Sequence, residues 1–179
     1  MKRILTAIIA IVVMGTGAFA HSTLNSNNTK KKESRTEIVT YLASLPDVSV
    51  TYITKSMLKK LPKGKPESPL GVLLDKGEVK SIRVFELGNK EAEIAGKKLL
   101  DSYISEQNPI LLIEPELLML QNSGSSESII YGIPFVNDIY RYSRILMYSK
   151  TQDKKAILII ISGSISESVI DELIDSFSN

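Results

Sequence analysis

The fold of this chain is decided by residues 156–161, which read AILIII. The run has no polar side, so it predicts a strand at the centre of a sheet, covered on both faces or paired deep within it. It is too short to span a bilayer, and Lys154 and Lys155 come just before it. Together with residues 142–149 it predicts a hairpin around the turn at residues 151–154.

Other segments predict strands and helices around this hairpin. Alternating apolar residues or short apolar runs predict strands, and apolar stripes at helical spacing predict helices. The expected strands are Val48–Tyr52, Val79–Leu87, Ile110–Ile113, Leu117–Leu120 and Ser128–Ile133. The expected helices are Glu37–Leu45, Thr54–Leu61 and Glu91–Glu106. A last helix is expected to begin with a capping box formed by Ser164 and Glu167. Because strands follow one another in runs, the sequence predicts an α+β fold: an antiparallel or mixed sheet of about five to six strands with helices packed on it.

The first 20 residues have the pattern of a secretory signal peptide. The start is positive, residues 4–14 are apolar apart from one threonine, and Ala18-Phe19-Ala20 has the small residues that signal peptidase recognises. We therefore expect cleavage after Ala20 and a periplasmic or secreted protein. Residues 21–35 predict a flexible polar and basic tether, and residues 36–179 predict a single domain.

Charge and cysteine content exclude several classes of protein. Lys2 and Arg3 lie in the predicted leader, so 20 of the 22 basic residues remain after cleavage, equal in number to the 20 acidic residues. A neutral domain has no overall positive field to attract nucleic acid, so no nucleic-acid partner is expected. The chain has no cysteine, which excludes disulfides, cysteine-ligated metals and a bacterial lipoprotein anchor. Lys30, Lys31 and Lys32 allow weak contact with an anionic membrane surface.

Three segments, taken together, resemble a known family. Residues 50–58 read VTYITKSML, residues 82–85 read IRVF, and residues 157–165 read ILIIISGSI. As a strand running into a short helix, a second strand, and a closing strand before a terminal helix, they resemble the domain-of-unknown-function family 4252 of exported Gram-negative bacterial proteins. The resemblance covers residues 36–178 and implies export and the limits of the domain, but no activity and no functional residues. Some members look like lipoproteins, a pattern from which this cysteine-free chain departs.

One predicted strand carries a candidate interaction surface. Regular alternation is expected to place on one face the side chains of Tyr140, Tyr142, Arg144, Leu146 and Tyr148. Tyrosine and arginine are enriched at binding hot spots, so the candidate surface consists of Tyr140, Arg141, Tyr142 and Arg144. Ordinary packing within a sheet is the alternative for the tyrosines.

No arrangement of residues predicts a catalytic, cofactor or metal site. His21 is the only histidine, so Ser-His-Asp chemistry and histidine-based zinc sites are excluded. Glu114 and Glu116 would share one face of a strand, as the paired carboxylates of a hydrolase can, but Pro115 interrupts that strand. Residues 162–164, Ser-Gly-Ser, predict a capped turn before a helix, with a bound anion as the alternative.

The sequence favours a non-enzymatic, exported binding or interaction domain, with an unidentified envelope protein or small ligand as its partner. Two alternatives remain open. The first is a hydrolase whose carboxylate site is not visible in the sequence. The second is an envelope-associated structural protein that uses Lys30–Lys32 at the membrane surface. No cofactor is expected, and no segment after the leader is long and apolar enough to span a membrane.

Overall fold

The computed structural model describes residues 34–60, 72–73, 78–105, 114–124, 126–151 and 154–178, without the side chains of residues 175–178. Several sequence predictions lie outside these residues. They are the signal peptide, nearly all of the tether with Lys30–Lys32, His21, and the expected strand at Ile110–Ile113.

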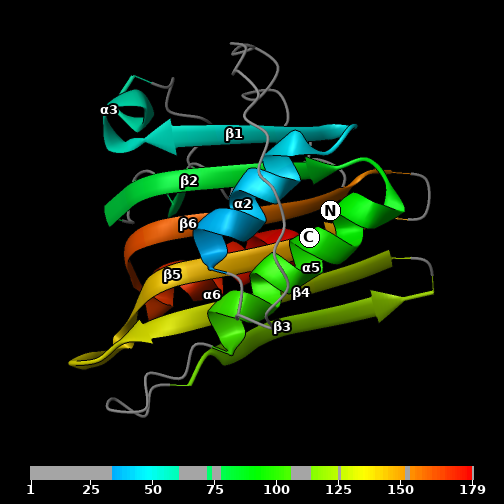
Figure 1. Ribbon diagram of the computed structural model, residues 1–179. Helices are drawn as coiled ribbons and strands as arrows, with labels where there is room; N and C mark the ends of the chain where they lie inside the picture. The colour runs from blue at the N-terminus through cyan, green and yellow to red at the C-terminus, as the bar shows by residue number, and fades with distance from the viewer. Residues whose placement is uncertain are drawn as a thin grey trace.

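Six strands of the described chain form one antiparallel sheet (Figure 1). In the order in which they lie side by side, they are β1 (Val48–Thr54), β2 (Glu78–Leu87), β6 (Ala156–Ser166), β5 (Asp138–Lys150), β4 (Ser126–Phe135) and β3 (Glu116–Ser123). The apolar run in β6 therefore lies in the interior of the sheet between β2 and β5, as predicted. The β5–β6 hairpin is also confirmed.

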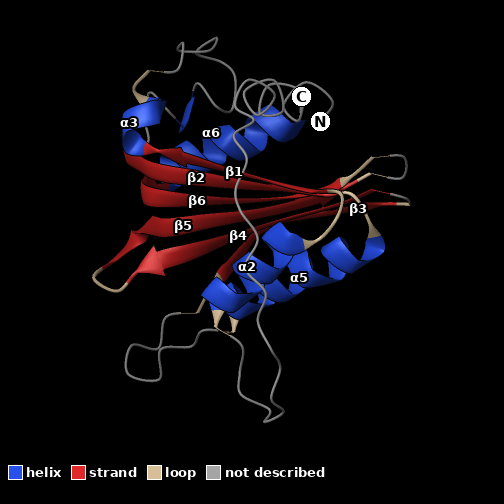
Figure 2. Cartoon of the chain, turned by 45° about the horizontal axis from the view of Figure 1, so that its top comes forward, coloured by secondary structure: helices blue, strands red, loops and turns tan. Residues whose placement is uncertain are grey.

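Helices cover both faces of the sheet, which makes three layers (Figure 2). On one face lie α2 (Arg35–Ser44) and α5 (Lys90–Ile104), and we call this the α2/α5 face. On the other, the α6 face, lie α6 (Glu167–Ser178) and the short α3 (Lys55–Leu58). The predicted α+β class, with helices packed on an antiparallel sheet, is thereby confirmed.

The central strand β6 contributes to the core on both faces. Because successive side chains of a strand point to opposite sides, its apolar run divides into two sets. Ile157, Ile159 and Ile161 belong to the core of the α6 face, and Ala156, Leu158 and Ile160 belong to the core of the α2/α5 face. All six are at most 4% exposed. Full burial of one such large apolar side chain stabilises the fold by about 1.5–3 kcal/mol.

Side-chain caps fix where α2 and α5 begin. The Glu37 N–H donates to Ser34 Oγ, and the Ser34 N–H donates to the Glu37 carboxylate, which together form a capping box. Asn89 caps α5, and its side-chain amide donates to the carbonyl of Pro46 at 2.8 Å. This bond ties the start of α5 to the turn after α2. The capping box makes α2 begin at Arg35, two residues earlier than predicted.

The predicted start of the last helix was wrong. β6 continues through Ser166, and α6 begins at Glu167 without the predicted capping box from Ser164. Gly163 lies within the strand, where a Cβ would come within 2.4 Å of the backbone oxygen of Glu78. The glycine therefore allows β2 and β6 to stay paired at this point, and it does not mark a turn.

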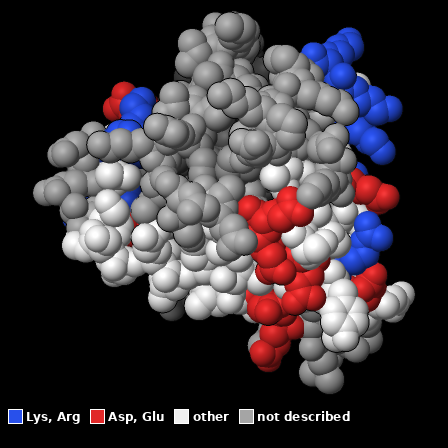
Figure 3. Space-filling model, turned by 180° about the vertical axis from the view of Figure 1, so that it is seen from behind, with Lys and Arg blue, Asp and Glu red and all other residues white. Residues whose placement is uncertain are grey.

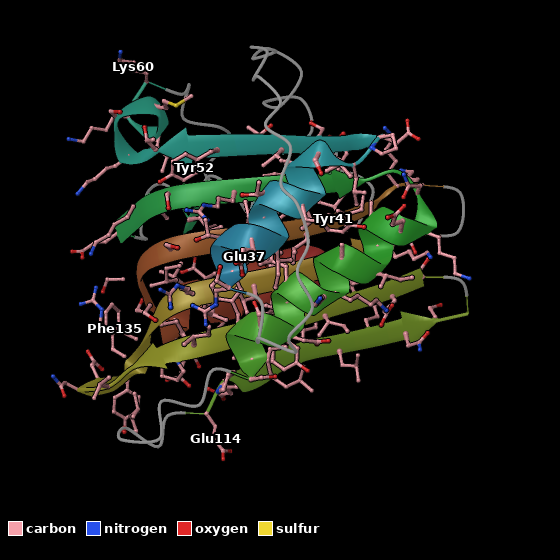
Figure 4. The ribbon with its side chains drawn as sticks, in the orientation of Figure 1. Glu37, Tyr41, Tyr52, Lys60, Glu114 and Phe135 are labelled. Carbon is pink, nitrogen blue, oxygen red and sulfur yellow. The ribbon has the colours of Figure 1, made fainter. Side chains whose placement is uncertain are left out.

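The alternating apolar residues that predict β1 are not its buried ones. Val50 and Tyr52 are exposed, and the buried residue is Ile53, whose side chain belongs to the core of the α6 face. The reason is that β1 is an edge strand, and its Val50 and Tyr52 lie at the margin of the α2/α5 layer. Tyr52 is labelled on this face in Figure 4.

Candidate functional site

A bulge in β5 divides the predicted interaction surface between the two faces of the sheet. The register of β5 against β4 shifts at this point: Ile133 is paired with Arg144 and Pro134 with Tyr142, which leaves Ser143 as the extra residue. Tyr142 lies in the core of the α6 face, whereas Arg144 lies on the α2/α5 face, as do Leu146 and Tyr148. The prediction of one shared face was therefore wrong for Tyr142, because an extra residue in one strand reverses the alternation beyond it.

Tyr142 is a core residue of the α6 face. It is 3% exposed, and its hydroxyl donates to a carboxylate oxygen of Glu116 at 2.7 Å. Burial raises the pKa of Tyr142, and the hydrogen bond to Glu116 raises it further. The tyrosine therefore ties edge strand β3 to the core and presents no surface to a partner.

Tyr140 lies at an apolar tip where β4 turns into β5. The hairpin extends beyond the ends of the neighbouring strands (Figure 1). Val136 is 48% exposed, Ile139 is 67% exposed and Tyr140 is 68% exposed, and Phe135 is half-buried beside them. The Tyr140 N–H donates to the Asp138 carboxylate at 3.2 Å, which fixes the turn. We call Phe135, Val136, Ile139 and Tyr140 the hairpin tip. Figure 4 labels Phe135 at this end of the sheet.

Two guanidinium groups lie over the ring of Tyr103 at the C-terminal end of α5. The Cζ atom of Arg35 is 4.2 Å from the ring centroid, and that of Arg144 is 5.7 Å from it. Arg35 also donates to the carbonyl of Ser102 at 3.2 Å, where the negative end of the helix dipole favours a cation. Burial lowers the pKa of Arg35, and the charge of Arg144 lowers it further.

Arg141 lies on the same face and has only weak compensation for its charge. Its guanidinium is 3.8 Å from the carboxylate of Glu78, a side chain that is mostly exposed. An exposed ion pair at this distance contributes little to stability. The Nε atom of Arg141 is buried and has no hydrogen-bond partner in the described part of the chain.

Ion pairs from α5 to the sheet hold the opposite end of the α2/α5 face. Lys97 and Glu127 are 2.9 Å apart, and Lys150 donates to Glu93. Tyr148 lies beneath them, 1% exposed, with the Lys97 ammonium 5.0 Å from its ring centroid. Its hydroxyl has no hydrogen-bond partner among the described residues. Burial raises the pKa of Tyr148 to about 12, with smaller contributions from Glu93 and Glu127.

The carboxylate pair considered in the sequence does not form a site. β3 begins at Glu116, so Glu114 is not on the strand, and its side chain points away from the sheet (Figure 4). Glu116 is engaged by Tyr142. Within the residues that the structure describes, no group of three or more His, Asp or Glu side chains is placed to hold a metal.

Sequence reasoning missed the other apolar residues of the hairpin tip and the arginine of α2 that contacts Tyr103. Phe135, Val136 and Ile139 flank the turn residues Asn137 and Asp138, and apolar residues on both sides of such a turn were the available signal. Arg35 gave no local signal, because it reaches Ser102 and Tyr103 from 67 and 68 positions away along the chain.

No protein-family model, curated protein or solved structure matches this chain. The resemblance to family 4252 therefore stays a prediction, and function has to follow from the geometry of this chain alone. None of the described helices is long and apolar enough to cross a membrane.

Proposed function

We propose that the chain is an exported, non-enzymatic interaction domain that binds a protein partner through the hairpin tip. The observation that carries this proposal is the exposure of Val136, Ile139 and Tyr140 at the end of a projecting hairpin. Single exposed apolar residues are common on monomers, but a contiguous apolar group at a projection is typical of a contact surface.

The chemistry of the tip favours a protein partner. An aromatic and aliphatic centre is bordered by Asp138 and Arg141, which resembles the apolar core and polar rim of a protein interface. The Asp138–Tyr140 hydrogen bond holds the turn in one conformation, so binding orders fewer groups than it would in a free loop. The predicted leader supports a partner in the envelope or outside the cell.

The test is site-specific photo-crosslinking in intact cells that express the full chain. A photoreactive residue in place of Tyr140 is expected to give one discrete protein adduct, and Val136→Ser with Ile139→Ser is expected to remove it. The matched control is the same probe at Ile94, an apolar residue of α5 that is 63% exposed and far from the tip. This control is expected to give no adduct.

Two outcomes contradict the proposal. One is an adduct that survives the double serine variant or that also forms from position 94. The other is an adduct with lipid and none with protein, which would favour an envelope-associated structural protein at the membrane surface.

A further inference from the structure

The α2/α5 face changes from apolar to polar toward the end of the sheet that carries the hairpin tip. Directly paired residues of an antiparallel sheet have side chains on the same face. Ser162 of β6 is paired with Ser81 of β2 and with Arg144 of β5. Ser164, the next residue of β6 on this face, is paired with Glu78, and Ser166, one position further on the same face, is paired with Arg141. A row of hydroxyl and guanidinium groups therefore follows the buried core on this face, which is the one turned toward the viewer in Figure 4.

Three arginines from two elements gather along this row. Arg141 and Arg144 come from β5, and Arg35 reaches across from the start of α2 to the Tyr103 ring that Arg144 also faces. We call Arg35, Arg141, Arg144 and Ser162, with the Tyr103 ring that Arg35 and Arg144 both contact, the arginine shelf. All three arginines are half-buried, where charges interact more strongly than they do in water.

The dipole of α5 explains why the positive charge of Arg35 is stable where it lies, but it does not explain the position of Arg144. Arg35 donates to a carbonyl in the last turn of α5, whereas the contact of Arg144 in the described structure is the face of the Tyr103 ring. Arg144 forms no ion pair with a carboxylate of the described chain. A second guanidinium held close to a first is unfavourable unless an anion compensates for the charge.

Arg141 gives an independent indication. Its Nε atom is buried and lacks a hydrogen-bond partner among the described groups, although buried donors in proteins are nearly always paired. Within the described chain, the carboxylate that pairs with Arg141 is that of Glu78. It lies 3.8 Å from the guanidinium, and the Glu78 side chain is largely exposed. A donor in this state is satisfied when a ligand brings an acceptor.

A group of negative charges lies on the other side of the sheet. Seen from behind, acidic side chains gather in a band (Figure 3). The exposed residues Glu167, Asp171 and Glu172 of α6 belong to that face. The sheet therefore separates this acidic band from the arginine shelf.

From these contacts we infer that the arginine shelf is a binding site for a small ligand that carries an oxyanion, a carboxylate or a phosphate. The planar guanidinium fork donates two parallel hydrogen bonds to such a group. The Ser162 hydroxyl is placed beside Arg144 to contact the same ligand. The site shares Arg141 with the border of the hairpin tip but includes none of the four tip residues, so this inference does not depend on the proposed protein partner.

The experiment measures binding of inorganic phosphate and of glucuronate to the purified full chain by calorimetric titration at low salt. At least one of the two is expected to bind saturably, and Arg144→Gln is expected to weaken that binding at least tenfold. The control Lys90→Gln removes an exposed cation at the other end of α5 and is expected to change affinity less than twofold. Equal thermal midpoints of the variants show that the fold is intact.

Arg141→Gln supplies a second variant that keeps the test decisive should Arg144→Gln fail to fold, and it is expected to weaken binding as well. Binding of phosphate alone would assign a phosphorylated ligand, and binding of glucuronate alone would assign an acidic sugar or another carboxylate. The inference is overturned when neither probe binds saturably, or when folded Arg144→Gln or Arg141→Gln binds as tightly as the unaltered chain.

Discussion

The two faces of the sheet are built from the same strands but have different chemistry. The α6 face is closed by a core that is rich in isoleucine and valine, and its acidic groups are on the outer surface of α6. The α2/α5 face has a core of leucine, alanine and aromatic residues, and it retains arginines at one end and a tyrosine hydroxyl without a partner at the other. One face is therefore almost purely a core, whereas the other combines a core with polar groups that packing alone does not explain.

The difference follows from what covers each face. Two helices pack on the α2/α5 face, and small residues of α5 let that helix approach closely: a Cβ on Gly96 would lie 2.4 Å from a side-chain carbon of Leu87. Helices cover a sheet incompletely at its ends, and long side chains such as Arg144 fill the margin. On the α6 face, β-branched residues fill the pleated surface directly.

The largest effects are expected from breaking either core. Leu158→Ala removes apolar contacts on the α2/α5 face, and Ile159→Ala removes them on the α6 face one residue away. Because both side chains are at most 4% exposed, each substitution is expected to lower the free energy of unfolding by about 2–5 kcal/mol. Urea denaturation measures this loss, with Ile94→Ala on the surface of α5 as the control. A loss below about 1 kcal/mol at one position would show that its face is not a true core.

A smaller effect on stability is expected from Tyr148, at the end of the α2/α5 face opposite the arginines. The raised pKa of Tyr148 means that the folded state keeps this proton at pH values where the unfolded state has lost it. Its contribution to stability is therefore complete below pH 10 and is lost progressively as pH rises from 10 to about 12, by on the order of 2 kcal/mol.

Tyr148→Phe isolates this contribution from the titration of lysines and other tyrosines. The variant is expected to lose less stability than the unaltered chain between pH 10 and 12, by urea titration at each pH. At pH 7 it is expected to be equally stable or more stable, because it removes a buried hydroxyl that lacks a partner. Parallel pH profiles of the two proteins would contradict the assigned burial of the hydroxyl.

The bulge that separates Tyr142 from Arg144 gives the next test. Ser143 Oγ donates to the carbonyl of Ile133 at 2.9 Å and so supports the bulge. Ser143→Ala is expected to lower the free energy of unfolding by about 1 kcal/mol, whereas Ser143→Thr keeps the donor and is expected to lose less. Equal losses from both variants would show that the hydrogen bond does not stabilise the bulge.

The smallest effect on stability is expected at the hairpin tip, which belongs to neither core. Ile139→Ser removes an exposed apolar side chain and is expected to change the free energy of unfolding by less than about 0.5 kcal/mol. Thermal unfolding measures this change. A loss of several kcal/mol would mean that the tip is needed for folding, and its exposure would no longer support a contact surface.

The regular elements were predictable because their signals are local. The polar-free run of β6, the β5–β6 hairpin and the stripe of α5 were all read from the spacing of apolar residues. The end of β6 was not predictable from local signals. Glycine is typical of turns, whereas Gly163 lies within the sheet, where the backbone of β2 approaches it closely.

The candidate sites were predicted only in part. Tyr140 was named and is exposed at the tip, and Arg141 and Arg144 were named and lie on the arginine shelf. Tyr142 was grouped with them because regular alternation gave no sign of a bulge. Bulges depend on hydrogen bonds such as that of Ser143 to Ile133 on the neighbouring strand, which the spacing of apolar residues does not reveal.

The sequence by itself determined the α+β class, the central position of the apolar strand and the absence of cysteine chemistry, because each depends on composition or on the spacing of near neighbours. Only the tertiary structure decided which side chains share a face beyond the bulge and which charges meet over Tyr103. Arg35 and Arg144 are 109 positions apart, and they come together only because α2 packs on α5 while α5 packs on the sheet. Contacts of this kind are set by the packing of whole elements, and no local pattern in the chain encodes them.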